Sequence, residues 1–345
     1  MNSIRLTQYS QGAGSGCTFD PDVLDSILAK AGSDAGHKRL IVGNLGHEGA
    51  AVYDLGDGRG MMASTDFFMP NVDDPFDFGR IAATNAISDI YAMGGKPVMA
   101  LGILGWPLDK LSTKVAGDVI AGAQAVCREL GVALAGGHSI DAPEPLFGLT
   151  VNGLVDLETL KLNCDAKPGD LLFLTKPLGV GLLTTAEKNG LLAAGHHGLA
   201  RETMLAPNTI GIELAKVKGV NAMAGVTGSG LAGHLADMCR ASGVMARIDF
   251  RRLPRLIEAE TYRRQGAVPE SALRNHELLG QALPLMDEAH WQWLCDPQTS
   301  GGLLFSVDPA WEDDVERIGR EHGLTLEPFG VIKRAQGKEL IEVVG

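Results

Sequence analysis

The stretch DPFDFGRIAATNAISD, residues 74–89, decides how the first half of the chain folds. Its apolar residues recur at helical spacing, so we expect a helix over residues 81–93. Asn85 and Asp89 are four positions apart and therefore lie on one face of that helix. Ile90 turns toward a hydrophobic core instead, which leaves Asn85 and Asp89 as the candidates for a polar site.

Asp66 follows a short apolar strand expected at residues 60–64, and it can converge on the polar face of the helix. That strand pairs with another at residues 50–55 through the turn Gly56-Asp57-Gly58. Two carboxylates and one carboxamide suit Mg²⁺ together with phosphate oxygens. The alternative is a solvated helix face with an aspartate cap, and the spacing alone favours this alternative.

Two further runs have the composition of anion-binding loops. A short buried strand at residues 132–135 leads into Gly136-Gly137-His138-Ser139, where glycines would let backbone N–H groups approach a phosphate. A plain turn explains a Gly-Gly pair equally well. The sequence CDPQTSGG, residues 295–302, is dense in turn and donor residues before an apolar run. It is either a second anion loop or a strand entry with capping.

The composition is typical of a folded protein with two domains. The chain has 345 residues, of which 45% are hydrophobic and 21% charged. A formal net charge of −12 argues against a nucleic-acid partner, because phosphates require a basic face. No apolar run approaches the ~18 residues that span a bilayer, and no signal peptide is visible. We therefore expect a cytoplasmic protein without a membrane partner.

Residues 1–20 are expected to form a mobile, glycine-rich arm that carries Ser15 and Cys17. An exposed Cys17 thiol could act as a nucleophile, although nothing nearby in the sequence lowers its pKa. The five cysteines are scattered and include no CxxC pair, so neither a zinc site nor a disulfide framework is expected. A helix should begin at Asp20-Pro21.

In order along the chain, these runs resemble the selenophosphate synthetase (selenide, water dikinase) family. The matching segments cover nearly the whole chain and are residues 4–10, 64–68, 74–89, 93–97, 135–145, 174–179 and 295–304. The resemblance implies an α+β, two-domain fold similar to the aminoimidazole-ribonucleotide synthetase superfamily, with a homodimer formed by N-terminal-domain strands. Turn residues gather near 157–169, so we place an ATP-binding and dimerisation domain at 21–157 and a second α+β domain at 158–345.

The resemblance also implies a reaction, in which ATP, selenide and water give selenophosphate, phosphate and AMP with the help of Mg²⁺. By the same resemblance, Asp66 and Asp89 bind ATP and the metal, and Asn85 lies beside the metal. The residues that match a family loop in contact with ATP are Gly137, His138 and Ser139.

Four positions depart from the family pattern. Ser15 replaces a cysteine or selenocysteine, and Thr18 replaces a lysine. Gly49 and Gly225 replace acidic metal ligands. Glu48 lies one position from Gly49 and is long enough to be a candidate substitute for the first of them.

These departures leave three hypotheses open. The first is a selenophosphate synthetase, slowed because a serine hydroxyl is a far weaker nucleophile than a thiolate, with Cys17 as a possible displaced nucleophile. The second is a catalytically inactive paralogue that keeps the dimer, binds nucleotide and pairs with an active paralogue; Gly49 and Gly225 favour it. The third is an ATP-dependent activity on another acceptor.

Overall fold

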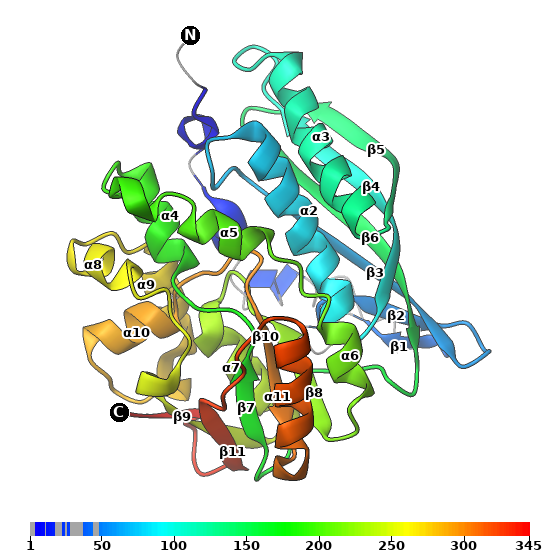
Figure 1. Cartoon of the computed structure of the whole chain (residues 1–345), viewed down its shortest axis with the longest axis vertical. Helices are drawn as coiled ribbons and strands as arrows, with labels where there is room; N and C mark the ends of the chain where they lie inside the picture. The colour runs from blue at the N-terminus through cyan, green and yellow to red at the C-terminus, as the bar shows by residue number, and fades with distance from the viewer. Residues whose placement is uncertain (1–3, 11, 18–22, 25, 28–36, 44–47) are drawn as a thin grey trace.

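The computed structural model describes residues 4–10, 12–17, 23–24, 26–27, 37–43 and 48–345. Thr18 and the helix start expected at Asp20-Pro21 lie outside this part of the chain. The described strands form two six-stranded sheets, one in each half, and helices pack against both (Figure 1). The α+β class expected from the sequence is confirmed.

The first sheet has the strand order β1-β2-β3-β6-β4-β5. Helices α2 (Pro75–Ala92) and α3 (Thr113–Glu129) lie on one face of it (Figure 1). All neighbouring strands are antiparallel except β4 and β5, which are parallel. The strands are β1 (Leu40–Val42), β2 (Ala51–Asp54), β3 (Arg59–Phe68), β4 (Lys96–Trp106), β5 (Ala133–Asp141) and β6 (Leu146–Asp156).

Helix α2 starts earlier than the sequence pattern indicates. The side chain of Asp74 accepts a hydrogen bond from the backbone N–H of Asp77 at 2.9 Å, and Pro75 occupies the first turn. Ile87 and Ile90 are fully buried, as the helical spacing predicts. The capped start fixes the axial position of α2, and with it the height at which its polar residues meet the sheet.

The second sheet has the order β12-β9-β11-β7-β10-β8. Its strands are β7 (Leu171–Leu174), β8 (Val220–Gly225), β9 (Val244–Asp249), β10 (Leu303–Val307), β11 (Gly330–Arg334) and β12 (Ile341–Val344). The helices of this half are α4 (Val180–Lys188), α5 (Leu199–Leu205), α6 (Gly211–Lys216), α7 (Gly230–Ser242), α8 (Ala259–Arg264), α9 (Glu270–Leu279), α10 (Glu288–Leu294) and α11 (Glu312–Glu321).

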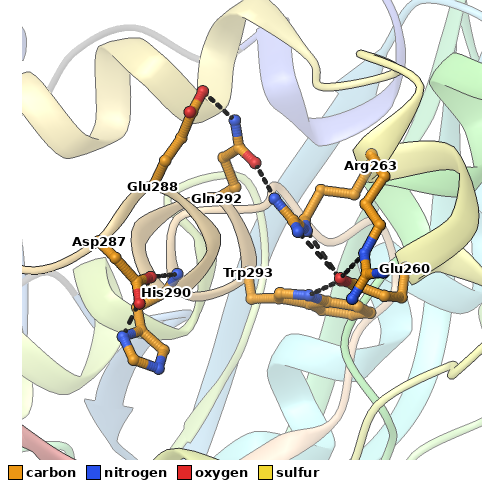
Figure 2. A network of polar contacts seen from close by, with 8 residues as sticks. Glu260, Arg263, Asp287, Glu288, His290, Gln292 and Trp293 are labelled. Atoms are coloured by element: carbon orange, nitrogen blue, oxygen red, sulfur yellow. Dashed lines mark hydrogen bonds and ion pairs between the residues drawn. The ribbon is translucent and has the colours of Figure 1, made fainter.

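Helices α8 and α10 are joined by a network of polar contacts (Figure 2). Glu260 accepts hydrogen bonds from Arg263 at 2.8 Å and from the indole N–H of Trp293 at 3.0 Å. Arg263 continues the network to Gln292 at 2.6 Å. The bond from Arg263 is the main reason that the pKa of Glu260 falls to about 2. The network contains no predicted site residue, and we assign it a structural role.

The described part of the N-terminal arm is packed against both halves of the chain, with residues 5–7 on the first half and residues 15–16 in contact with the second. Leu6 is fully buried, and Arg5 forms an ion pair with Asp73 at 2.6 Å. The backbone N–H of Thr7 donates to the same carboxylate at 3.2 Å. Within the described residues, no helix is long and apolar enough to cross a membrane.

Candidate active site

Asp66 lies inside β3, which corrects the expectation that it follows the strand. Burial alternates along β3, and the side chains of Met62 and Ser64 point to the buried side that α2 covers. Asp66 has the same parity and points the same way, and its Oδ2 accepts a hydrogen bond from Asn85 Nδ2 on α2. The predicted convergence of strand and helix on one polar site is therefore present.

Asp89 lies one turn beyond Asn85 on α2, and its Oδ2 accepts a hydrogen bond from Ser64 Oγ on β3. The solvated helix face offered as an alternative does not exist, because Asn85 is only 1% exposed. The sheet covers this face, so the polar residues of α2 are enclosed between two elements. Apolar packing of α2 alone would not require polar side chains there.

The folded environment of Asp66 and Asp89 favours the protonated form of each carboxyl group. Burial raises the pKa of Asp66 to about 6, opposed by the hydrogen bond from Asn85. Burial also raises the pKa of Asp89, and the charge of Asp66 adds to the effect. Two desolvated carboxylates that repel each other are stabilised by a cation placed between them.

The residues present fit a Mg²⁺ ion that a bound phosphate completes. No group of three or more His, Cys, Asp or Glu side chains in the described ranges is arranged to hold a metal by itself. Asp66 and Asp89 supply two carboxylates, and Mg²⁺ is commonly held by one or two carboxylates plus substrate phosphates. Among the residues that the structure describes, the protein side chains therefore provide an incomplete set of ligands.

Gly49 and Gly225 both face the C-terminal half of α2. A Cβ at Gly49 would lie 3.3 Å from Oδ1 of Asp89, so a side chain there would meet that carboxylate. Gly225 ends β8, and the nearest atom to its Cβ position is the methyl group of Ala92, 3.9 Å away. The two glycines flank one end of α2, and of the two only Gly49 lies within contact distance of Asp89.

Glu48 does not join the two aspartates. Its Oε1 accepts a hydrogen bond from the backbone N–H of Asn163 at 2.9 Å, which directs the carboxylate toward the connection between the two sheets. Burial raises the pKa of Glu48 to about 7, the bond from Asn163 lowers it, and the charge of Asp165 raises it. The structure gives no support to Glu48 as a substitute ligand in this conformation.

Ser15 approaches the site from the N-terminal arm. It is 3% exposed, its N–H donates to Thr299 Oγ1 at 3.1 Å, and its Oγ donates to Asn85 Oδ1 at 3.4 Å. Cys17 is half-buried rather than exposed, and burial raises the pKa of its thiol. A raised pKa leaves less thiolate at neutral pH, which weakens Cys17 as a displaced nucleophile.

Gly137, His138 and Ser139 lie in the edge strand β5, not in a loop, and all three are exposed. The glycines allow a bulge against β4: Gly137 has φ 151°, and a Cβ there would lie 2.0 Å from the carbonyl oxygen of Gly102. Gly137 shares a row of the sheet with Asp66, but β4 and β6 lie between them, a separation of about 14 Å.

The sequence reasoning missed how the CDPQTSGG segment is used. The N–H of Ser300 donates to Asn85 Oδ1 at 2.6 Å. Asn208 Nδ2 donates to Ser88 Oγ at 2.7 Å and to the carbonyl oxygen of Gly301 at 2.8 Å. The segment therefore clamps the polar face of α2 from the second half. Its density of donor residues was the available signal, but its partner could not be identified from sequence.

Comparison with known proteins places this fold among the AIR synthase related proteins. The AIR synthase related protein family matches through its N-terminal domain at residues 47–155 and its C-terminal domain at residues 167–342. Thiamine-monophosphate kinase from Stenotrophomonas maltophilia superposes with a TM-score of 0.65 at 20% identity, covering 94% of this chain and 96% of that one. Hydrogenase maturation protein HypE in complex with ATP superposes with a TM-score of 0.62 at 19% identity, covering 99% and 95%.

Relatives with more than 50% sequence identity identify the particular family within these proteins. A selenide, water dikinase from Aeromonas hydrophila is 55% identical over 344 residues, covering 100% of both chains. One from Escherichia coli K12 is 52% identical over 343 residues, covering 99% of each. The chain belongs to the selenide, water dikinase family.

Proposed function

We propose that the protein catalyses ATP-dependent synthesis of selenophosphate, in which ATP, selenide and water give selenophosphate, phosphate and AMP. The family relatives support this reaction, and the ATP complex of a protein with the same fold supports ATP as the nucleotide. The observation that carries the proposal is the enclosed group of Asp66, Asn85 and Asp89 between β3 and α2. It has the chemistry needed to receive a metal-bound phosphate chain.

In this proposal Asp66 and Asp89 hold Mg²⁺, which when bound neutralises negative charge on the phosphates. Asn85 fixes the orientation of Asp66 by donating to its Oδ2. Ser15, at the position of the family nucleophile, lies beside Asn85. A serine hydroxyl is poorly nucleophilic without a base, and its burial excludes water rather than activating the group. We therefore expect slow turnover.

A second candidate is a catalytically inactive paralogue that binds nucleotide or regulates an active one. The observation that favours it is that Gly49 brings no carboxylate to a position directly beside Asp89, where a Cβ would already lie 3.3 Å from Oδ1 of that residue. Loss of ligands weakens metal-dependent turnover more than it disturbs the fold, so nucleotide binding can persist. This candidate predicts ATP binding without release of AMP.

Release of AMP separates the two candidates. The protein is incubated with ATP and Mg²⁺, with and without anaerobic selenide, and AMP is measured by chromatography. Selenide-dependent AMP that disappears in Asp89→Asn supports the enzyme, and Ser15→Cys should then raise the rate. Bound ATP with no AMP in any sample supports the inactive paralogue, and AMP that forms equally without selenide indicates another acceptor.

We further propose a homodimer formed through the open face of the first sheet. Large apolar side chains lie on that face in three strands: Phe67 is 49% exposed, Met61 44%, Leu101 38% and Leu154 36%. The register Phe67–Gly148–Ile103–His138 places His138 on the same face. In such a dimer, we propose that residues 137–139 contact the nucleotide bound at the site of the partner subunit.

We also propose that the boundary between the two domains lies after residue 157. The first sheet ends with β6 at Asp156, and the second begins with β7 at Leu171. Expression of residues 158–345 alone, followed by thermal unfolding, tests it. A cooperative transition supports the boundary, and an unfolded fragment argues against it.

A further inference from the structure

Lys176 lies two residues past the end of β7 and has no place in the site described so far. It is 7% exposed. Its Nζ donates to the backbone carbonyl oxygens of Ala206 at 2.5 Å and Ser300 at 2.7 Å. Within the described residues, these contacts are to carbonyl groups and not to a carboxylate. Burying an ammonium group is costly, so a lysine at this position needs a reason beyond packing.

Ser300, whose carbonyl oxygen accepts a hydrogen bond from Lys176, has an unusual backbone conformation. Among the described residues it is the one non-glycine with a positive φ, at 49°. Its buried Oγ has no hydrogen-bond partner in that part of the chain, so its side chain does not fix this conformation. The backbone does: the carbonyl oxygen accepts from Lys176, and the N–H donates to Asn85 Oδ1 at 2.6 Å. A strained conformation of this kind persists where surrounding contacts determine it.

The bond from Ser300 decides which way the amide of Asn85 points. With Oδ1 occupied by the Ser300 N–H, Nδ2 is left to donate to Asp66. The flipped amide would place Oδ1 against a carboxylate and Nδ2 against an N–H donor, and both contacts are repulsive. Lys176, Ser300 and Asn85 therefore form a chain of hydrogen bonds from the second sheet to Asp66.

We propose that Lys176 is a positioning residue for the candidate active site, which acts through the backbone of Ser300, across its Cα, and through the side-chain amide of Asn85 to orient Asp66. The inference rests on the proposed function for the purpose of this orientation. Asn208, which binds both Ser88 and Gly301, is a separate clamp between α2 and the same segment. Because this clamp remains, loss of the Lys176 donor should release the orientation of Asn85 without separating the two halves.

The test follows the side-chain amide of Asn85 by NMR in protein labelled with ¹⁵N-asparagine and free of ligand, with Asn85→Ala identifying the signal. Lys176→Met removes the donor at nearly constant volume. Lys161→Met is the matched control, because Lys161 Nζ also donates to a backbone carbonyl, that of Val220 at 2.7 Å. In Lys176→Met we expect the Asn85 amide protons to shift upfield and to exchange with water about tenfold faster, the factor for one hydrogen bond to a charged group. The control should leave both unchanged.

An unchanged Asn85 signal in folded Lys176→Met overturns the proposal, as does the same change in the control. If Lys176→Met does not fold, the wild-type protein decides: a scalar coupling across the hydrogen bond between Ser300 N and Asn85 Cγ is expected, and its absence overturns the proposal. Calorimetry with ATP and Mg²⁺ adds a functional readout, in which Lys176→Met should bind about fivefold more weakly. Failure of every variant to bind ATP would count against the proposed function, while the Asn85 signal still decides the role of Lys176.

Discussion

A Cβ at Gly49 would lie 3.3 Å from Oδ1 of Asp89. An acidic side chain at position 49 would therefore lie next to the Asp89 carboxylate, and the two could bind the same metal ion. Gly225 faces Ala92, one turn further along α2. Because both glycines flank the same end of one helix, we expect the effects of the two departures on binding to be coupled.

Restoring the carboxylates should strengthen metal-dependent nucleotide binding. We expect Gly49→Asp with Gly225→Asp to raise the affinity for ATP in the presence of Mg²⁺ about tenfold or more, because two more oxygens can reach the cation. Calorimetry with and without Mg²⁺ measures this. The matched control is Gly49→Asn with Gly225→Asn, which has similar volume without charge. Equal affinities in the two double variants would show that the metal binds elsewhere.

The stability of the protein should fall as the pH rises through the acidic range. The folded state raises the pKa of Asp66 from 3.8 to about 6 and raises that of Asp89 as well. Between these values the folded state binds more protons than the unfolded state, so the favourable contribution present near pH 4 is lost above pH 6. Asp89→Asn should flatten this dependence and be more stable than the wild type at pH 7, because it removes a carboxylate whose pKa the folded state raises.

Urea unfolding at a series of pH values measures the effect. Asp109→Asn, which removes an exposed aspartate, is the control and should keep the wild-type profile. A profile for Asp89→Asn that is parallel to the wild type would mean that the carboxylate is not electrostatically strained in the folded protein.

Ser300 should tolerate glycine better than a β-branched residue. Its φ of 49° lies in the left-handed region, which glycine adopts freely and valine does not. We expect Ser300→Gly to keep or raise the free energy of unfolding by up to about 1 kcal/mol, and Ser300→Val to lower it by about 1–3 kcal/mol. Chemical denaturation of both variants checks the order, and a reversed order would place Ser300 in another conformation.

The open face of the first sheet should hold two subunits together. Phe67→Asp puts a charge on that face, and we expect dimers of the wild type to give way to monomers in light scattering, because burying an unpaired carboxylate costs several kcal/mol. Phe76 is 41% exposed but lies on α2, so Phe76→Asp is a matched control that should remain dimeric. A wild-type monomer, or equal effects of both substitutions, would contradict the proposed interface.

Short-range sequence patterns correctly predicted features that depend only on neighbouring residues, such as a shared helix face and a tight turn. The spacing of Asn85 and Asp89 predicted their common face, and Gly56-Asp57-Gly58 predicted the turn between β2 and β3. Strand β5 was cut short because Gly136 and Gly137 have the composition of a loop. In the folded chain these glycines form a bulge, and the neighbouring strand β4 determines this. Sequence patterns do not show such partners.

Long-range contacts explain the remaining errors. The bond between Ser300 and Asn85 joins residues 215 positions apart, and that between Ser15 and Thr299 joins residues 284 positions apart. Neither hydrogen bond can be predicted from the periodicity of the sequence. The same limit applies to Glu48, whose length suggested a metal ligand until its carboxylate was located at Asn163.

Phosphorus NMR of the purified protein with ATP, Mg²⁺ and anaerobic selenide tests the proposed reaction most directly, with a parallel sample that lacks selenide. We predict a selenophosphate signal that grows with AMP and phosphate in equal amounts, only in the sample with selenide. ATP that stays unchanged in both samples, while the protein still binds it, would contradict selenophosphate synthesis and leave the inactive paralogue as the account of this chain.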